Sequence, residues 1–239
     1  MTNGTICNEG GQRAGMKKIG KWFFPEHERH LIDWMASPKG YLVLNGRESY
    51  QGKKQLLAMD LVPKNRRRTA IDIGGHIGLW SYNLAHWFKH VEAFEPVQAH
   101  RDCFVENMMA LPEPRNVNLN PCALGDREGV VSITTETGSS GNSFVSVKGK
   151  GEVPMHTLDS FEFGDVDFIK IDTEGYEEFI LRGGEETIRR CWPIIVVEQK
   201  RDMSATRFGL APLSAVKFLT GLGYKTAAEK SGDYVMMHP

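Results

Sequence analysis

Short apolar runs alternate with longer amphipathic segments from Thr69 onward, and this alternation restricts the possible folds more than any other feature of the sequence. The apolar runs are too short for buried helices and are typical of strands that are covered on both faces. Because a helix can carry the chain from one strand to a parallel neighbour, the alternation predicts an α/β fold. We predict a doubly wound, mostly parallel sheet of seven strands.

The individual elements can be placed from their apolar patterns. Strands are predicted for the runs TAIDIG, HVEAFEP, NVNLNPCAL, VDFIKID and PIIVVEQK, with helices over 79–88, 98–110, 176–190 and 213–222. GYKTAA and DYVMMH are predicted to close the sheet as an antiparallel pair. Residues 129–147 alternate like a hairpin with a tip of Gly, Ser and Asn, so we interpret them as an insertion that can overhang a ligand.

The first 60 residues precede this pattern and are predicted to form a tail and a cap segment. Residues 1–15 lack periodicity and are rich in Gly, Asn and Thr, which favours a poorly ordered lead-in. An approach segment and a helix from about Glu26 follow, and then the short strand YLVL with a turn at Asn45-Gly46. We therefore expect a helical N-terminal appendage over 1–60 and one main domain over 61–239.

Composition argues against several classes of function. The chain has 29 basic and 30 acidic side chains and a formal net charge of -1, so we expect no nucleic-acid partner. No stretch reaches the roughly 18 apolar residues of a membrane span, and no apolar leader is present, so we predict a cytoplasmic protein without a membrane partner. The four cysteines are scattered without C-x-x-C spacing, which predicts no structural zinc.

The first strand passes into its helix through a glycine turn, with the sequence DIGGHIG from Asp72 to Gly78. Glycines at this point let the backbone approach a ligand at the helix N-terminus. The pattern is not the dinucleotide fingerprint G-x-G-x-x-G, and a carboxylate before the first glycine would repel a pyrophosphate. The ammonium and sulfonium of S-adenosylmethionine would instead favour Asp72, so we interpret this residue as the one that selects the cofactor. Gly74 and Gly78 have an alternative role in the close packing of helix on strand.

Glu95 ends the second strand, 23 positions beyond Asp72 (95 minus 72). An open doubly wound sheet places the acceptor for a ribose diol at this position, and the two carboxylate oxygens can accept both hydroxyl groups. Taken alone, Glu95 can equally be a solvated surface residue. Together with the glycine turn it predicts a nucleotide-type cofactor in a Rossmann-like fold, with S-adenosylmethionine as the preferred candidate.

The fourth strand ends in Asp172 and Glu174, which flank one residue and precede a glycine that starts a helix. Ligands of such sheets bind outside the carboxyl ends of the strands, so both carboxylates should face the cofactor crevice. Methyl transfer needs alignment, a dry pocket and a group that takes the acceptor's proton, and Asp172, Glu174 or a histidine, His76 or His156, can serve. Alternatively, Glu174 only caps the helix and Asp172 only orients backbone.

Two further charges belong to this edge of the predicted sheet. Lys170 lies on an otherwise apolar strand, so we expect it to pair with a carboxylate. Glu198 ends the fifth strand, and Asp172, Glu174 and Glu198 together could share a divalent ion. Our prediction is a site without metal, with the divalent ion as the alternative.

These motifs resemble the FkbM-type methyltransferases, a group of S-adenosylmethionine-dependent O-methyltransferases associated with natural products, sugars and glycans. The resemblance runs from about Ala70 to Lys200 and rests on AIDIGGHIGLWS, EAFEPV, CALGDREG, HTLDSF and above all IKIDTEGYE, followed by LRGG and VVEQK. It implies a class I methyltransferase fold with Asp172 and Glu174 in the active site. The cofactor contacts that we take from these motifs are Asp72, Gly74, His76, Gly78, Glu95 and Pro96, with Ala123 and Leu124 on the adenine side. The family turn usually reads like GANIG, and His76 replaces its asparagine.

The leading hypothesis is O-methylation of a hydroxyl on a sugar, a glycan or a small polar metabolite, by a monomer or a homodimer. N-methylation of a nucleobase or another amine is the main alternative, although the fourth strand ends in Asp-Thr-Glu-Gly and not in the D/N-P-P-Y/W tetrad that docks a flipped base. A nicotinamide-dependent oxidoreductase is opposed by Asp72 and by the glycine spacing. A non-catalytic S-adenosylmethionine-binding module is the alternative from another class, and Asp172 and Glu174 argue against it.

Overall fold

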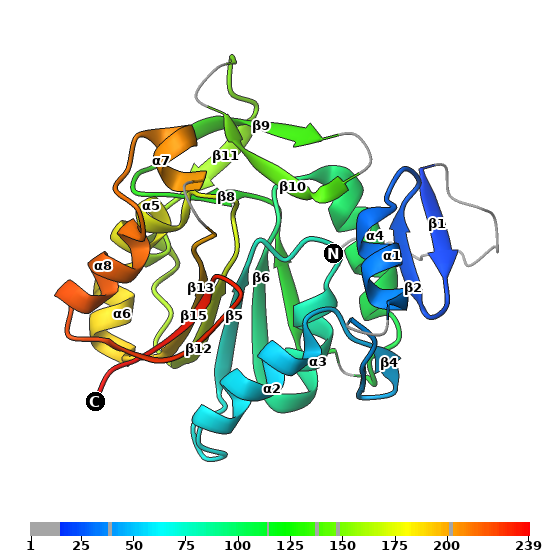
Figure 1. Cartoon of the computed structure of the whole chain (residues 1–239), viewed down its shortest axis with the longest axis horizontal. Helices are drawn as coiled ribbons and strands as arrows, with labels where there is room; N and C mark the ends of the chain where they lie inside the picture. Colours follow the sequence, from blue (N-terminus) through cyan, green and yellow to red (C-terminus); the bar gives the residue numbers. More distant parts are fainter. Residues whose placement is uncertain (1–14, 38–39, 114, 137–138, 147–148, 201–202) are drawn as a thin grey trace, which may run out of the picture.

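The computed structural model describes residues 15–37, 40–113, 115–136, 139–146, 149–200 and 203–239. Cys7 and the predicted lead-in up to residue 14 lie outside the described residues. Within them, the chain forms a seven-stranded sheet covered by helices, with a smaller sheet above one end of it (Figure 1).

The seven-stranded sheet has the order β14-β15-β13-β12-β5-β6-β7. The five strands from β13 to β7 are parallel, and β15 and β14 are antiparallel additions at one edge. The predicted mostly parallel sheet with a closing antiparallel pair is therefore confirmed. The bounds are Thr69–Ile73 for β5, His90–Phe94 for β6, Val117–Asn120 for β7, Val166–Ile171 for β12, Ile194–Glu198 for β13, Lys225–Lys230 for β14 and Asp233–Met237 for β15.

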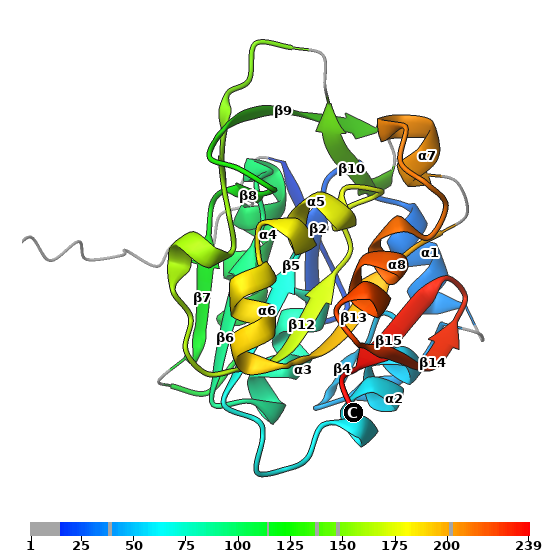
Figure 2. The ribbon, with the colours of Figure 1, turned by 90° about the vertical axis from the view of Figure 1, so that its left-hand side faces the viewer.

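Helices cover both faces of this sheet (Figures 1 and 2). On one face lie α2, α3 and α4, and on the other lie α5, α6 and α8. The bounds are Gly52–Leu61 for α2, Leu79–Trp87 for α3, Gln98–Met108 for α4, Glu177–Arg182 for α5, Glu185–Cys191 for α6, Met203–Phe208 for α7 and Ser214–Gly221 for α8.

The central strands are buried on both faces, as their apolar runs predicted. Ile71 and Ile169 pack toward α5, α6 and α8, whereas Phe168 packs toward α2 and α3. Because side chains alternate along a strand, Lys170 shares the face of Phe168. Its register partner across the sheet is Asp72, which therefore points to the same face.

Two predicted elements are divided in the structure. The predicted helix over 176–190 is interrupted at Gly183, where a Cβ would lie 1.9 Å from the carbonyl oxygen of Gly125, and it forms α5 and α6. The predicted strand NVNLNPCAL breaks at Pro121, which has no N–H for a ladder bond. Its first part is β7, and its second part is β8 (Ala123–Leu124) in the smaller sheet.

The smaller sheet has the order β10-β9-β11-β8. The predicted insertion is confirmed as an antiparallel hairpin of β9 and β10, and β11 lies between β9 and β8. Figure 1 shows this sheet above the carboxyl ends of the main parallel strands. The bounds are Gly129–Glu136 for β9, Ser139–Ser146 for β10 and Val153–His156 for β11, followed by the short 3-10 helix η1 over Asp159–Phe161.

The N-terminal segment is mixed in structure, where the sequence predicted a helical appendage. Its apolar side chains from β2 and α1 pack with those of α3 and α4 in one cluster. Helix α2 lies in a stretch for which no helix was predicted, and it runs across the predicted domain boundary between residues 60 and 61. The bounds are Met16–Ile19 for β1, Trp22–Pro25 for β2, His30–Ala36 for α1, Val43–Leu44 for β3 and Arg47–Glu48 for β4.

Among the helices of the described ranges, none combines the length and the apolar character needed to cross a membrane. Cys103, Cys122 and Cys191 are buried free thiols. The cytoplasmic location and the oligomeric state stay predictions.

Candidate active site

A cavity lies at the carboxyl ends of β5, β6 and β12, where the sequence predicted a ligand. Residues of the β9–β10 hairpin and of the N-terminal segment complete its lining. Asp72, Gly78 and His156 are not among the lining residues. Eight of the predicted site residues do line it: Gly74, His76, Glu95, Pro96, Ala123, Leu124, Asp172 and Glu174.

The glycine turn brings backbone to the wall of this cavity. Gly74 has a φ of +76°, and a Cβ there would lie 2.1 Å from the carbonyl oxygen of Asp172. Glycine is therefore required for the turn to pass so close to the end of β12. The N–H groups of Gly74 and Gly75 each donate to the carbonyl oxygen of Phe94 at 3.0 Å, which holds the turn against β6.

Glu95 lies at the end of β6 and is only 4% exposed. Its Oε2 accepts a hydrogen bond from the backbone N–H of His76 at 2.8 Å, and its Oε1 accepts one from the N–H of Val97 at 2.8 Å. The Nδ1 atom of His100 lies 3.2 Å from Oε1. These contacts fix the orientation of the carboxylate and leave Oε2 with an acceptor site for a ligand hydroxyl.

Asp72 does not reach the cavity, where we predicted a direct contact with the cofactor. Strand alternation turns its fully buried side chain toward α3, and its Oδ2 accepts a hydrogen bond from Ser81 Oγ at 2.6 Å. Its Oδ1 lies 3.3 Å from Lys170 Nζ. The carboxylate therefore holds Lys170 in place and does not contact a ligand in the cavity.

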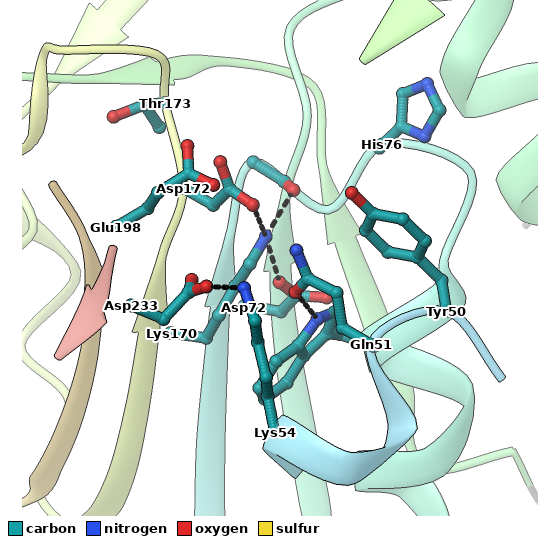
Figure 3. A network of polar contacts seen from close by, with 12 residues as sticks. Tyr50, Gln51, Lys54, Asp72, His76, Lys170, Asp172, Thr173, Glu198 and Asp233 are labelled. Carbon is teal, nitrogen blue, oxygen red and sulfur yellow. Dashed lines mark hydrogen bonds and ion pairs between the residues drawn. The ribbon is translucent and has the colours of Figure 1, made fainter. Parts of the chain in front are cut away.

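Lys170 connects both halves of the site, and its expected carboxylate partner is confirmed (Figure 3). Its Nζ donates to the carbonyl oxygen of Gly74 at 2.8 Å and lies 3.9 Å from Asp172 Oδ2. Burial lowers the pKa of Lys170, but Asp72 and Asp172 outweigh burial, so the pKa is raised and the ammonium stays charged. The buried cation thus holds the glycine turn next to the end of β12.

Two other predicted site residues, Gly78 and His156, contact neighbouring parts of the fold and do not line the cavity. Gly78 caps α3 with a φ of +88°, and a Cβ there would lie 2.6 Å from Met108 Cε, so it packs closely against α4 and not, as in the alternative, against a strand. His156 ends β11, which pairs with β8 and β9 in the smaller sheet, and it is not among the lining residues of the cavity. Its Nδ1 lies 2.6 Å from Glu128 Oε2, and its side chain is 42% exposed. The structure therefore does not bring His156 to the site as a base.

Three carboxylates meet at the ends of β12 and β13, and we call this part of the cavity the carboxylate end. Asp172, Glu174 and Glu198 each offer one oxygen, and these oxygens lie within 4.8 Å of one another. Burial raises the pKa of Asp172, but Lys170 and Lys200 outweigh burial and lower it. Burial and the charge of Asp172 raise the pKa of Glu198 well above its usual value. The two neighbouring carboxyl groups therefore have pKa values shifted in opposite directions.

Glu174 lines the cavity in a left-handed backbone conformation, with a φ of +58°. Such a conformation costs about 1–3 kcal/mol and persists only where the surroundings impose it. Arg207 of α7 imposes it here, because its Nη1 donates to the carbonyl oxygen of Glu174 and lies 3.4 Å from Oε2. Burial and the charge of Asp172 raise the pKa of Glu174, which moves it toward the range in which a general base is most effective.

Two further cavity residues, Tyr50 and Lys200, were not among the predicted site residues. Tyr50 lines the cavity, and burial together with Asp172 raises its pKa to about 12, so its hydroxyl keeps its proton. Its ring packs edge-on against Trp34, with centroids 5.0 Å apart. Lys200 also lines the cavity and contacts the carboxylate of Glu198. A signal for Lys200 was present in VVEQK, where it follows Glu198 by two positions.

Polar contacts fix the position from which Tyr50 enters the cavity (Figure 3). Lys54 of α2 contacts the carboxylate of Asp233 on β15, and Gln51 Oε1 accepts a hydrogen bond from Trp80 Nε1 at 3.1 Å. Gln51 has a φ of +55°, so the chain turns sharply after Tyr50. The N-terminal segment is thereby anchored to both the sheet and α3.

The charge balance at the carboxylate end does not favour the alternative with a divalent ion. A divalent ion needs carboxylate oxygens that are free of cationic partners. Each carboxylate has such a partner: Lys170 at 3.9 Å for Asp172, Arg207 at 3.4 Å for Glu174, and Lys200 for Glu198. The site without metal therefore stays our prediction.

The strand order, the two helical layers and the cavity at the carboxyl ends of the parallel strands define a Rossmann-like fold of the class I methyltransferase type. The family model of the methyltransferase FkbM domain matches residues 72–226, more than half of the chain. The chain belongs to this family, and the resemblance seen in its motifs is confirmed. The matched span includes the glycine turn, Glu95, the β9–β10 hairpin and all three carboxylates.

Among the solved structures that match, the first described here supports the fold. The crystal structure of methyltransferase FkbM from Methylobacillus flagellatus has a TM-score of 0.51 at 15% sequence identity, and the match covers 72% of this chain and 43% of that chain. This chain thus spans less than half the length of that protein. A putative methyltransferase from Streptococcus mutans in complex with SAH gives a TM-score of 0.48 at 12% identity, covering 76% and 94% of the two chains. Precorrin-6y C5,15-methyltransferase from Geobacter metallireducens gives 0.47 at 14% identity, covering 83% and 93%. A search of curated proteins gave no match.

Proposed function

We propose that the chain is an S-adenosylmethionine-dependent methyltransferase that methylates a hydroxyl group of a sugar, a glycan or a small polar metabolite. The observation that carries this proposal is a single cavity with two unlike ends. One end, which we call the cofactor end, consists of the glycine turn, Glu95 and the apolar residues Ala123 and Leu124. The other is the carboxylate end. When bound, S-adenosylmethionine supplies an electrophilic methyl group on its sulfonium.

The glycine turn is unsuited to a pyrophosphate and thereby supports S-adenosylmethionine over a nicotinamide cofactor. A dinucleotide-binding turn presents free N–H groups to the phosphates. Here the N–H groups of Gly74 and Gly75 donate to Phe94, and that of His76 donates to Glu95. What the turn offers instead is backbone that lines the cavity, beside a carboxylate with an acceptor site for a ribose hydroxyl.

The carboxylate end supports a hydroxyl as the acceptor. A hydroxyl must lose its proton as its oxygen attacks the methyl group, so this reaction needs a base. Asp172 and Glu174 have pKa values shifted in opposite directions, an arrangement that divides two roles between neighbouring carboxyl groups. In this proposal Glu174 takes the proton, and the ionised Asp172 orients the hydroxyl by accepting its hydrogen bond.

Charge compensation at this end also supports a neutral acceptor. The cations Lys170, Arg207 and Lys200 offset most of the charge of the three carboxylates and of Asp72, so little net charge is left to attract an ionic substrate. The protonated hydroxyl of Tyr50 adds a donor to the carboxylate acceptors. Hydroxylated molecules, which both donate and accept, match this set.

The test is calorimetric titration with S-adenosylmethionine and S-adenosylhomocysteine, with NAD as a control, followed by methyl transfer from labelled S-adenosylmethionine to panels of sugars, polyols and amines. We expect binding of the first two compounds, none of NAD, and label on hydroxylated acceptors. If neither adenosyl compound binds, the cofactor assignment is wrong. Label on amines alone would replace O-methylation by N-methylation.

A further inference from the structure

Ser140, near the start of β10, joins three separate parts of the chain. Its backbone N–H donates to Glu28 Oε2 at 2.7 Å, and its hydroxyl donates to the same oxygen. The hydroxyl oxygen also lies 2.8 Å from His76 Nε2. Glu28 precedes α1 in the N-terminal segment, and His76 belongs to the glycine turn. The insertion hairpin is thus tied to both.

The hydrogen bonds of this cluster have one consistent direction. Because the Ser140 hydroxyl gives its single proton to Glu28, it accepts from His76, and Nε2 carries the proton. Burial and the neighbouring His100 lower the pKa of His76 well below its usual value, so the ring is neutral and has one N–H to give. Glu28 is 1% exposed, and its Oε1 accepts a hydrogen bond from the N–H of Leu31 at 2.8 Å. The acceptor that holds Ser140 is therefore itself fixed.

The cluster lies against the cofactor end of the cavity. His76 contacts the hairpin with its side chain, and its backbone N–H donates to Glu95 at 2.8 Å. The β10 residues 140–145 all line the cavity. At the far end of this stretch, the guanidinium of Arg207 stacks on Phe144, 4.0 Å from the ring centroid. β10 is thus held at both ends along the cavity wall.

We propose that Glu28, Ser140 and His76 form a clasp that holds β10 over the bound cofactor and slows its release. The clasp makes Glu28, which precedes the family-matched span, a positioning residue for the cofactor. It also gives His76, which stands where the family turn usually has asparagine, a function in the chain. The ligand named here, S-adenosylhomocysteine, rests on the proposed function.

The clasp predicts faster release of S-adenosylhomocysteine when it is opened. Release from the full chain can be followed by tryptophan fluorescence after displacement with excess S-adenosylmethionine, since Trp80 lines the cavity. Ser140→Ala should raise the dissociation rate roughly tenfold, because it removes both hydroxyl contacts. Ser132→Ala is the matched control: Ser132 lies on β9 of the same hairpin, accepts a hydrogen bond from the N–H of Gly151, and is not among the cavity residues. It should change the rate by less than about twofold.

A double-mutant cycle separates the clasp from a general loosening of the fold. His76→Asn keeps a residue that tolerates the left-handed conformation, φ +49°, but is too short to reach Ser140. The double variant His76→Asn/Ser140→Ala should release the ligand no faster than the faster single variant, because both remove the same contact. If the two substitutions raise the dissociation rate additively, the clasp is wrong and the proposed function is untouched. The same holds if Ser140→Ala binds the ligand and releases it at an unchanged rate. Absence of S-adenosylhomocysteine binding in the unaltered chain would overturn the proposed function and the ligand assigned to the clasp.

Discussion

At the cofactor end of the cavity, backbone of the glycine turn forms much of the wall, whereas at the carboxylate end charged side chains form it. The cofactor end depends on a glycine turn, a neutral His76 and one oriented carboxylate, Glu95. The carboxylate end depends on three carboxyl groups balanced by cations from β12, α7 and the residues after β13. The difference implies that a change of shape should impair binding at the cofactor end, and that a change of charge should impair turnover at the carboxylate end.

The largest effect should come from shape at the cofactor end. Gly74→Ala places a Cβ 2.1 Å from the carbonyl oxygen of Asp172, in a backbone conformation that alanine disfavours. We expect binding of S-adenosylhomocysteine to be lost and the free energy of unfolding to fall by about 3 kcal/mol. Calorimetry and urea unfolding measure both. Gly164→Ala, where a Cβ has nothing within 4 Å, is the control. If Gly74→Ala binds S-adenosylhomocysteine with wild-type affinity, the close approach of the backbone at Gly74 is not needed for binding.

A change of charge at the carboxylate end should act on turnover and not on cofactor binding. Glu174→Gln keeps the shape but removes the proposed base, so we expect kcat to fall by about 100-fold or more, with affinity for S-adenosylhomocysteine unchanged within about threefold. Glu178→Gln is a matched control, because Glu178 is also buried but pairs with Arg182 outside the cavity. Undiminished turnover in Glu174→Gln would exclude Glu174 as the base.

Beneath the carboxylate end, Glu177 should make stability depend on pH. Its carboxyl group accepts hydrogen bonds from the N–H groups of Thr173 and Gly175, yet burial raises its pKa to about 7. Because the folded state then holds the proton up to a higher pH than the unfolded state, stability is lost as the pH rises from about 4.5 to 7. This group should contribute a loss of about 2 kcal/mol between pH 5 and pH 7.

Urea unfolding of the unaltered chain and of Glu177→Gln at several pH values measures this contribution. The variant cannot titrate at this position, so its stability should decline less over the same interval. Parallel curves for the two proteins would show that Glu177 titrates alike in the folded and unfolded states.

The smallest effect should come from removal of metal ions. Since each carboxylate has a cationic partner, EDTA treatment followed by desalting should leave turnover within about twofold of the untreated protein. The assay is methyl transfer from labelled S-adenosylmethionine. Turnover lost with EDTA and restored by Mg²⁺ would mean that an ion displaces the cations, and that the carboxylate end works as a metal centre.

The same contrast explains what the sequence could predict. The turn, Glu95, Asp172 and Glu174 follow strand ends, and the topology of a parallel sheet brings strand ends together, so local patterns were sufficient. The distance of two residues from Gly74 predicted a cofactor contact for Asp72, but the alternation of side chains along β5 turns its carboxylate toward α3.

Residues that come from outside the sheet could not be found in this way. Tyr50 and Glu28 reach the cavity region through an N-terminal segment whose path depends on packing against α3 and α4. His156 lies at a strand end too, but its strand belongs to the smaller sheet. Sequence patterns do not reveal which sheet a short strand joins, because that choice depends on long-range pairing.

The packing of the N-terminal segment has a practical consequence for work with shortened forms of the protein. Trp22, Phe24 and Leu31 are almost fully buried in a cluster shared with Tyr82 and Phe104 of the main body. A fragment trimmed to the family-matched span 72–226 would expose that apolar surface and should aggregate on expression. Limits drawn from family similarity are therefore not the limits of a piece that can be produced and purified.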